Sequence, residues 1–340
     1  MDASLFQVIW FWLIALLIGG YFVLDGFDLG AGALYPFIAK NEKDKAIIRR
    51  SIGPVWDGNE VWLLTAGGAL FAAFPMAYAT TFSGFYLAIM LVLFCLIVRA
   101  TALEFRSRDK KWKKIWDILF FLGSALPALL LGVAAGNVLQ GVPLNANGDV
   151  IVNIPVIDLL TLFPLICGVL GLVLFLAQGA AWIALKAPEK SNLHKRAAKL
   201  KAPFQIVALV VFVAATVVVL FLVSPEMVAG LAIVRYALAA LFVIALVGAI
   251  VMKKNDVWSF LLQSGGLIFL VFLWAASQFP NLVPATQGTA VSITNGASSD
   301  LTLMWMTIIT CVGVPLVLFY HFLIYRSFRG RITDADLTSY

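Results

Sequence analysis

Long apolar segments alternate with short polar ones along the whole chain. Each apolar segment approaches or exceeds the roughly 20 residues that a helix needs to cross a hydrocarbon core of about 30 Å. Because these segments are unbroken, they argue against a membrane β-barrel, whose strands alternate polar and apolar positions. The pattern predicts nine membrane-spanning helices, at about residues 5–36, 57–74, 80–103, 115–139, 158–184, 203–223, 229–252, 257–278 and 301–326.

The first apolar segment, 5–36, is too long for one straight crossing. We expect it to be tilted, kinked near Gly19–Gly20 or extended beyond the membrane. No polar stretch is long enough for a soluble domain, so we expect residues 1–340 to form a single transmembrane domain of the all-α, polytopic class. Nine spans can pack as two four-helix groups plus one further helix.

Composition agrees with this class. The chain has 340 residues, of which 62% are hydrophobic and 12% charged. Average soluble proteins are about 45–50% apolar and about 25% charged. An ordinary water-soluble enzyme is therefore excluded, because one core of this size could not bury so much apolar surface.

The basic residues lie on alternate connections. Of the 24 Lys and Arg residues, 22 lie in connections 37–56, 104–114, 185–202 and 253–254 and in the tail after residue 325. The intervening connections contain none. By the positive-inside rule the N-terminus is outside, the C-terminus is inside and the number of spans is odd.

Ionisable residues within spans are informative because each costs roughly 2.5–3.5 kcal/mol at a helix centre. Several lie in the cytoplasmic half of the first three predicted spans: Asp25, Asp28, Asp57, Glu60, Arg99 and Glu104. We expect the acids to form a proton-uptake path that relays protons through water. A structural polar plug is the alternative.

Asp25 and Asp28 are three residues apart, so they share one helical face. Gly26 and Gly30 form a pair of small residues that lets another helix approach closely. A polar helix end in the inner headgroup zone is the alternative interpretation of both acids.

The other candidates have structural alternatives as well. Asp57 follows Pro54 in a first helical turn, where the helix dipole favours a carboxylate. Glu60 lies deeper. Arg99 either extends to the inner headgroups or neutralises one of the acids, and Glu104 would then collect protons at the surface.

The sequence predicts no metal site. Axial haem ligands within spans are usually His or Met, and the one histidine near a span end, His321, is better interpreted as a boundary residue. Trp56 and Trp62 differ from the other tryptophans because they flank the acids of the second span. The chain also has no nucleotide-binding fingerprint and no nucleophile elbow.

Around these acids the sequence resembles subunit II of the cytochrome bd-type quinol oxidases. The similarity is dense over residues 15–145. It is carried by Asp-Gly-Phe-Asp-Leu-Gly at 25–30, Trp-Asp-Gly-Asn-Glu-Val-Trp-Leu at 56–63, and the stretches 67–75, 82–86 and 136–143.

The resemblance implies an oxidase complex that oxidises quinol and reduces dioxygen to water. Protons would come from the cytoplasm, without pumping through the protein. The haem b groups and haem d would be ligated by subunit I, so this chain would hold no cofactor and would not be catalytic alone. The expected location is the bacterial inner membrane, with subunit I, lipids and quinol as partners, room for a small single-span accessory subunit, and no nucleic acid.

The resemblance also implies roles for particular residues. Arg99 would be the charge partner of the acids, and Trp56 and Trp62 would lie near a dioxygen route or an interface. Members of that family also have Gln at the position that corresponds to Glu60. The proton path would comprise Asp25, Asp28, Asp57, Glu60 and Glu104.

Two other functions remain open at this point. Intramembrane acids also suit a proton-coupled secondary transporter, although the sequence has neither paired broken helices nor a repeat between its halves. In a purely structural assembly subunit the acids would be replaceable.

Overall fold

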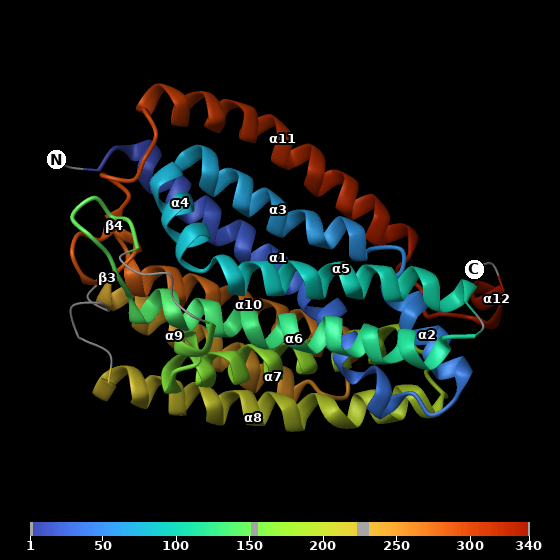
Figure 1. The fold of residues 1–340 in the computed structure, drawn as a ribbon. Helices are drawn as coiled ribbons and strands as arrows, with labels where there is room; N and C mark the ends of the chain where they lie inside the picture. The colour runs from blue at the N-terminus through green and yellow to red at the C-terminus, as the bar shows by residue number, and fades with distance from the viewer. Residues whose placement is uncertain (1–2, 110, 151–155, 223–230, 339–340) are drawn as a thin grey trace.

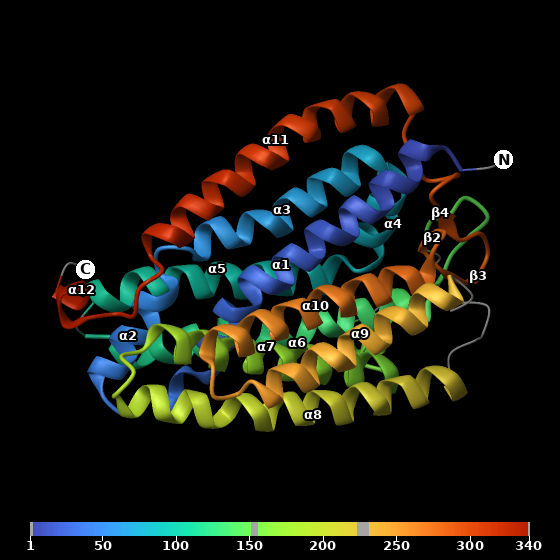
Figure 2. The same ribbon diagram turned by 180° about the vertical axis from the view of Figure 1, so that it is seen from behind.

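The computed structural model describes residues 3–109, 111–150, 156–222 and 231–338. These residues are mostly helical (Figure 1; Figure 2 shows the reverse side). The helices are α1 (Leu5–Ile38), α2 (Glu42–Ile52), α3 (Trp56–Ala73), α4 (Pro75–Gly84), α5 (Tyr86–Arg108), α6 (Lys113–Gln140), η1 (Val156–Leu159), α7 (Leu162–Lys186), α8 (Asn192–Leu222), α9 (Ala232–Val251), α10 (Asp256–Gln278), α11 (Asp300–Ser327) and α12 (Asp334–Thr338).

Eight helices in the described part of the chain are long and apolar enough to cross a membrane: α1, α5, α6, α7, α8, α9, α10 and α11. Helix α3 has 18 residues but is not among them. Its first two turns contain Asp57, Asn59 and Glu60, which lower its mean hydropathy. The polar residues that drew attention in the sequence therefore distinguish α3 from these eight helices.

Several helix bounds differ from those expected. The segment 80–103 is not one helix, because α4 ends at Gly84 and α5 begins at Tyr86. Pro75 opens α4, where its missing N–H costs nothing. Helix α8 begins at Asn192, eleven residues before the expected 203, and α2 forms within the connection 37–56. Helix α1 is continuous from Leu5 to Ile38.

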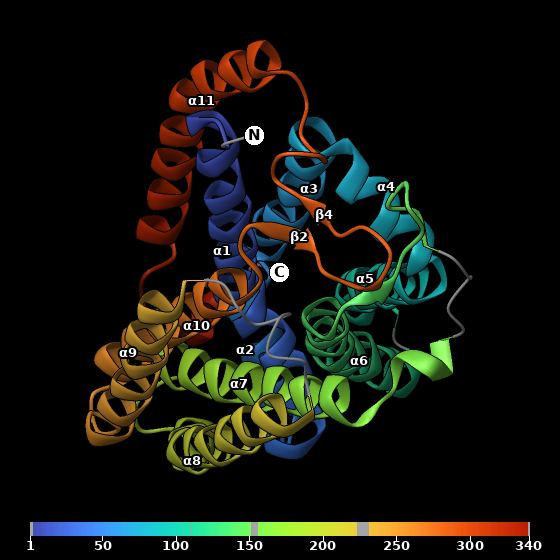
Figure 3. The same ribbon diagram turned by 90° about the vertical axis from the view of Figure 1, so that its left-hand side faces the viewer.

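Helix α1 lies at the centre of the packing. It contacts α3, α6, α7 and α10, while α5 packs on α6, α8 on α7 and α9 on α10. Helix α11 lies at the edge of the molecule beside α1 and α3 (Figure 3). Two helices approach closely at Gly30, where an added Cβ would lie 1.8 Å from the backbone oxygen of Phe175 on α7. The small residues of α1 thus admit α7.

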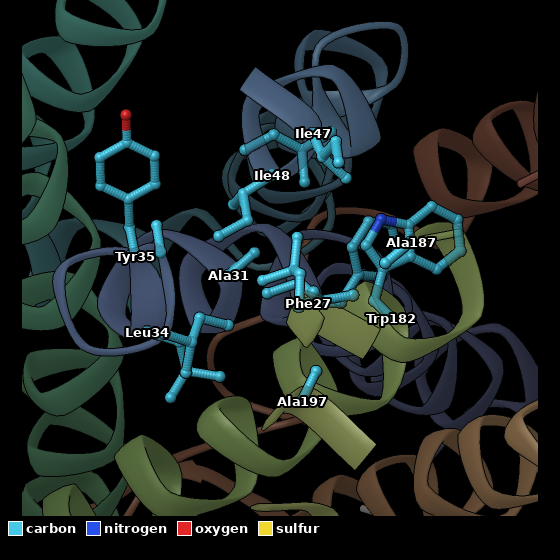
Figure 4. Close-up of a cluster of buried hydrophobic side chains, with 14 of the residues drawn as sticks. Phe27, Ala31, Leu34, Tyr35, Ile47, Ile48, Trp182, Ala187 and Ala197 are labelled. Carbon is cyan, nitrogen blue, oxygen red and sulfur yellow. The ribbon is translucent and has the colours of Figure 1, made fainter. Parts of the chain in front are cut away.

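A buried cluster of apolar side chains joins α1, α2, α7 and α8. Phe27 of α1 stacks on Trp182 of α7 with ring centroids 4.1 Å apart. Ile47 and Ile48 of α2 are buried against the same cluster (Figure 4). Helix α2 is therefore held against the bundle by its apolar face.

Two pairs of short strands tie connections together where α1 begins. Strand β1 (Val142–Pro143) pairs in parallel with β3 (Ala285–Gln287), and β2 (Asn281–Val283) pairs antiparallel with β4 (Val291–Ser292). Helices α2 and α12 lie at the opposite end of the bundle (Figure 1). We refer to these ends as the strand end and the α2 end.

Candidate functional site

A buried ion pair joins α1 to α5. Arg99 donates from Nη2 to Asp25 Oδ1 over 2.7 Å, and the same nitrogen also donates to Glu60 Oε1 on α3. The side chains are 2% exposed for Arg99, 0% for Asp25 and 25% for Glu60. The guanidinium of Arg99 therefore lies inside the bundle between three helices and does not extend to the surface.

Asp28 belongs to a second arm of the same site. Asn59 on α3 donates from Nδ2 to Asp28 Oδ2 over 2.8 Å and to the Leu24 carbonyl over 3.2 Å. Tyr325 on α11 donates its hydroxyl proton to Asn59 Oδ1 over 2.8 Å. The arm thus links α1, α3 and α11. We call Asp25, Asp28, Asn59, Glu60, Arg99 and Tyr325 the acid cluster.

The charges of the acid cluster do not balance when every group is ionised. It contains three carboxyl groups and, among the residues described, one guanidinium. A net charge of −2 in so buried a place would be costly. The cluster is neutral when two of the three carboxyls hold a proton.

Some polar atoms of the acid cluster have no hydrogen-bond partner within the described residues. These atoms are Asp25 Oδ2, Asp28 Oδ1 and Arg99 Nη1. The hydroxyl of Tyr21, one helical turn before Asp25, is in the same condition. A carboxyl oxygen without a protein donor can carry a proton or accept a bond from water. Both properties suit proton transfer.

Two of the predicted acids are not in the cluster. Asp57 is exposed in the first turn of α3, where the helix dipole favours it. Glu104 is 51% exposed, and its nearest cation is Arg108 at 4.0 Å. The structure therefore brings together Asp25, Asp28, Glu60 and Arg99 and leaves Asp57 and Glu104 on the surface.

Trp62 is half-buried between α1 and α11. Its ring packs against Gly20 of α1, and its Nε1 donates to His321 Nε2 on α11 over 3.2 Å. His321 Nδ1 lies 3.0 Å from the Val317 carbonyl, so the tautomer that fits carries its proton there. Both ring nitrogens of His321 are engaged. Trp56 is half-buried against the apolar cluster at the α2 end.

A further polar network at the α2 end was not predicted. Asp117 Oδ1 on α6 accepts from Arg106 Nε at 2.6 Å and from Tyr35 OH at 2.8 Å. Its other oxygen accepts from Lys45 Nζ at 2.8 Å. The hydrogen bond from Arg106 holds the pKa of the Glu42 carboxyl below its ordinary value. An acid in the first turns of an apolar segment flanked by basic connections was the available signal.

Tyr325 is the other participant that the sequence did not indicate. A tyrosine near the end of the last apolar segment is an ordinary boundary residue. Its bond to Asn59 spans 266 positions in sequence, so only the packing of α11 beside α3 reveals it.

The similarity to known proteins extends over nearly the whole chain. The family model described as cytochrome bd terminal oxidase subunit II matches residues 6–328. Cytochrome bd-I ubiquinol oxidase subunit 2 of Escherichia coli strain K12 is 35% identical, covering 99% of this chain and 98% of that protein. Cytochrome bd ubiquinol oxidase subunit 2 of Bacillus subtilis strain 168 is 34% identical, covering 98% of each chain.

The fold also matches a solved structure. A chain of the bd oxidase from Geobacillus thermodenitrificans superposes with a TM-score of 0.74. The match covers 96% of this chain and 99% of that one at 17% sequence identity. At this identity the likeness concerns the fold alone.

Proposed function

Because the chain belongs to the cytochrome bd terminal oxidase subunit II family, we propose that its acid cluster takes up protons for the reduction of dioxygen in the oxidase complex. The chain is a multi-pass membrane subunit of a respiratory oxidoreductase, with a subunit I as its partner. Family membership favours this role over a proton-coupled transporter. The carrying observation is the buried grouping of Asp25, Asp28 and Glu60 around one cation, Arg99.

The topology we propose has nine spans in one transmembrane domain, residues 1–340. Helix α3 is the span added to the eight apolar helices. The N-terminus lies outside and the C-terminus inside the bacterial inner membrane. Support comes from the basic residues of α2 and of the α7–α8 connection, which lie at the α2 end. Helices α1, α3, α5 and α6 form one four-helix bundle, α7 to α10 form the other, and α11 is peripheral, as the packing partners support.

In the proposed path, protons arrive at the α2 end. Asp57 and Glu104 are exposed and collect protons at the surface. Glu60, one helical turn from Asp57 and a quarter exposed, passes them inward. Asp25 and Asp28 receive them, with Arg99 limiting the net charge of the cluster. Water between these groups completes the relay.

The partner subunit completes the path in this proposal. Gly67 and Gly68 of α3 leave open space beside the helix. Leu64, one helical turn before them, is exposed as well. Small residues on a helix surface let another helix approach closely. We therefore place subunit I on this surface of α3, with Trp56 and Trp62 near a dioxygen route or the interface.

The haems belong to subunit I in this proposal, and this chain ligates none. His321 is engaged at both ring nitrogens, and His194 Nε2 lies 2.9 Å from Asp256 Oδ2. These contacts leave His321 no nitrogen for an axial bond. Haem b and haem d would supply electron transfer and dioxygen binding, with quinol as the electron donor of the complex. A small accessory subunit and lipids complete the proposed assembly.

The test uses the assembled complex with Asp25→Asn. We expect quinol-dependent oxygen consumption to fall by on the order of tenfold or more, the scale of a lost proton-transfer group. Haem absorbance should stay at the wild-type level. Asp158→Asn, an exposed acid at the strand end, is the control and should keep full turnover.

Two results would contradict this role. Full turnover in Asp25→Asn would remove the acid from the path. Loss of haem in proportion to loss of turnover would favour the structural assembly function instead.

A further inference from the structure

A cavity of about 140 Å³ opens at the α2 end among α2, α7, α11 and the chain that follows α11. Among the described residues, basic side chains dominate its polar lining: Arg50, Lys186 and Arg331, against one carboxyl, Asp336. The space is large enough for a few waters at about 30 Å³ each, or for one phosphate-sized group.

Lys186 is the most unusual of these side chains. The residue is only 5% exposed, and its ammonium group lies 4.8 Å from the centre of the Trp182 ring. The ammonium donates to the Phe328 carbonyl at the end of α11. Within the described chain no carboxylate lies within 4 Å of it. One neutral acceptor serves a group with three donors.

The two arginines add positive charge to the same cavity. Arg50 lies above the Phe328 ring at 5.8 Å. Arg331 donates to the carbonyls of Ala184 and Ala187 and lies 3.0 Å from Asp256 Oδ2.

The acids near the cavity cancel this charge only in part. Asp256 bonds both Arg331 and Lys201, so it is shared between two cations. Asp336 accepts from the backbone N–H and hydroxyl of Thr333, both at 2.7 Å, and the positive charge of Arg50 also acts on it. Lys186 is the lining cation that has no described carboxylate within 4 Å, and its charge disfavours use of the cavity as a proton inlet.

We propose that this cavity binds a phosphate group, with Lys186 and Arg50 as its charged ligands. Guanidinium and ammonium groups form strong charge-assisted bonds to phosphate. A phosphate would supply the acceptors that the buried ammonium of Lys186 lacks. In the orientation proposed above, the cavity lies at the inner membrane surface, where basic pockets between helices bind phospholipid headgroups. Free phosphate has the same chemistry and is the second possible source.

The proposal has a structural consequence. Tyr325 lines the cavity and also donates to Asn59 of the acid cluster. A phosphate held here would fix the ends of α7 and α11 together, and with them the position of Tyr325.

The experiment compares the assembled oxidase complex with its Lys186→Gln and Lys190→Gln variants. Lys190 is exposed on the α7–α8 connection close to Lys186, so it is the matched control. Two quantities are measured: phospholipid phosphorus per haem after detergent purification, and the shift in Tm on adding inorganic phosphate rather than chloride at equal ionic strength. Assembly is checked by haem absorbance, which does not depend on proton uptake.

Each result is decisive. Loss of one phospholipid per complex in Lys186→Gln but not in Lys190→Gln identifies a lipid headgroup. Equal phospholipid content, with a phosphate-induced rise in Tm that only Lys186→Gln loses, identifies free phosphate. If Lys186→Gln does not assemble, Arg50→Gln takes its place. If neither quantity distinguishes the Lys186 or Arg50 variant from Lys190→Gln, the proposal is wrong.

Discussion

Replacing Arg99 with Gln tests the electrostatic balance of the acid cluster. The change removes the cation that bonds Asp25 and Glu60 and leaves their oxygens in the bundle. Removing one partner of a buried ion pair costs about 3–5 kcal/mol. Asp25 is fully buried, but Glu60 is a quarter exposed and water can solvate it. We therefore expect a loss near the lower limit, about 3 kcal/mol in the free energy of unfolding.

A double-mutant cycle separates this charge effect from lost packing. Asp25→Asn removes the fully buried carboxylate that Arg99 balances. The double variant with Arg99→Gln should then cost less than the sum of the single variants, with a coupling of about 1–3 kcal/mol. Arg108→Gln is the control because Arg108 is 81% exposed and 4.0 Å from its partner. It should change stability by less than about 0.5 kcal/mol.

The assay is unfolding of the purified complex in a graded denaturing detergent, followed by circular dichroism. Proton occupancy adjusts when a charge is removed, so all variants are compared at one pH. Additivity of the two single variants within about 0.5 kcal/mol would refute the argument. The argument would also be refuted if Arg99→Gln had the same free energy of unfolding as the wild type.

Three further predictions address the fold, the α11 link and the α2 end. Gly30→Ala places a Cβ 1.8 Å from the Phe175 backbone oxygen, so α1 and α7 must separate. We expect the free energy of unfolding to fall by about 1–3 kcal/mol, and the amount of haem-bearing complex recovered on purification to fall with it. Tyr325→Phe removes one hydrogen bond to the α3 amide and should cost about 1 kcal/mol, measured by detergent unfolding, with haem content unchanged. Glu42→Gln tests pH dependence: the hydrogen bond from Arg106 lowers the pKa of Glu42, so its stabilisation exists above the ordinary Glu pKa and is lost as the pH falls through the lowered value. Tm measured against pH should therefore separate Glu42→Gln from wild type near neutrality and bring the two together in acid.

The helices and part of the acid cluster follow from sequence for physical reasons. A helix in lipid satisfies its own backbone, so a long apolar segment has few other structures open to it. Asp25 and Asp28 share a face because of their spacing. For Arg99 the sequence left two interpretations, extension to the inner headgroups or pairing with an acid, and the structure shows the pair with Asp25.

Other features depend on packing that no local pattern encodes. The strands β1 and β3 contain two and three residues and pair across more than 140 positions. The pairing of Tyr325 with Asn59 requires α11 to lie beside α3. Asp57 suits both a first helical turn, where the dipole favours a carboxylate, and a proton path within the span. Only the structure shows that it is exposed.

Proton uptake through the acid cluster is tested most directly with Asp28→Asn. Asp28 is fully buried, and its described hydrogen bond comes from a neutral amide, so the change keeps the shape and removes the ionisable group. The measurement is the rate of proton uptake from solution, followed with a pH-sensitive dye after the reduced complex is mixed with dioxygen. We predict that uptake slows by on the order of tenfold or more while dioxygen binds haem at the wild-type rate. Uptake at the wild-type rate in both Asp28→Asn and Asp25→Asn would contradict the account.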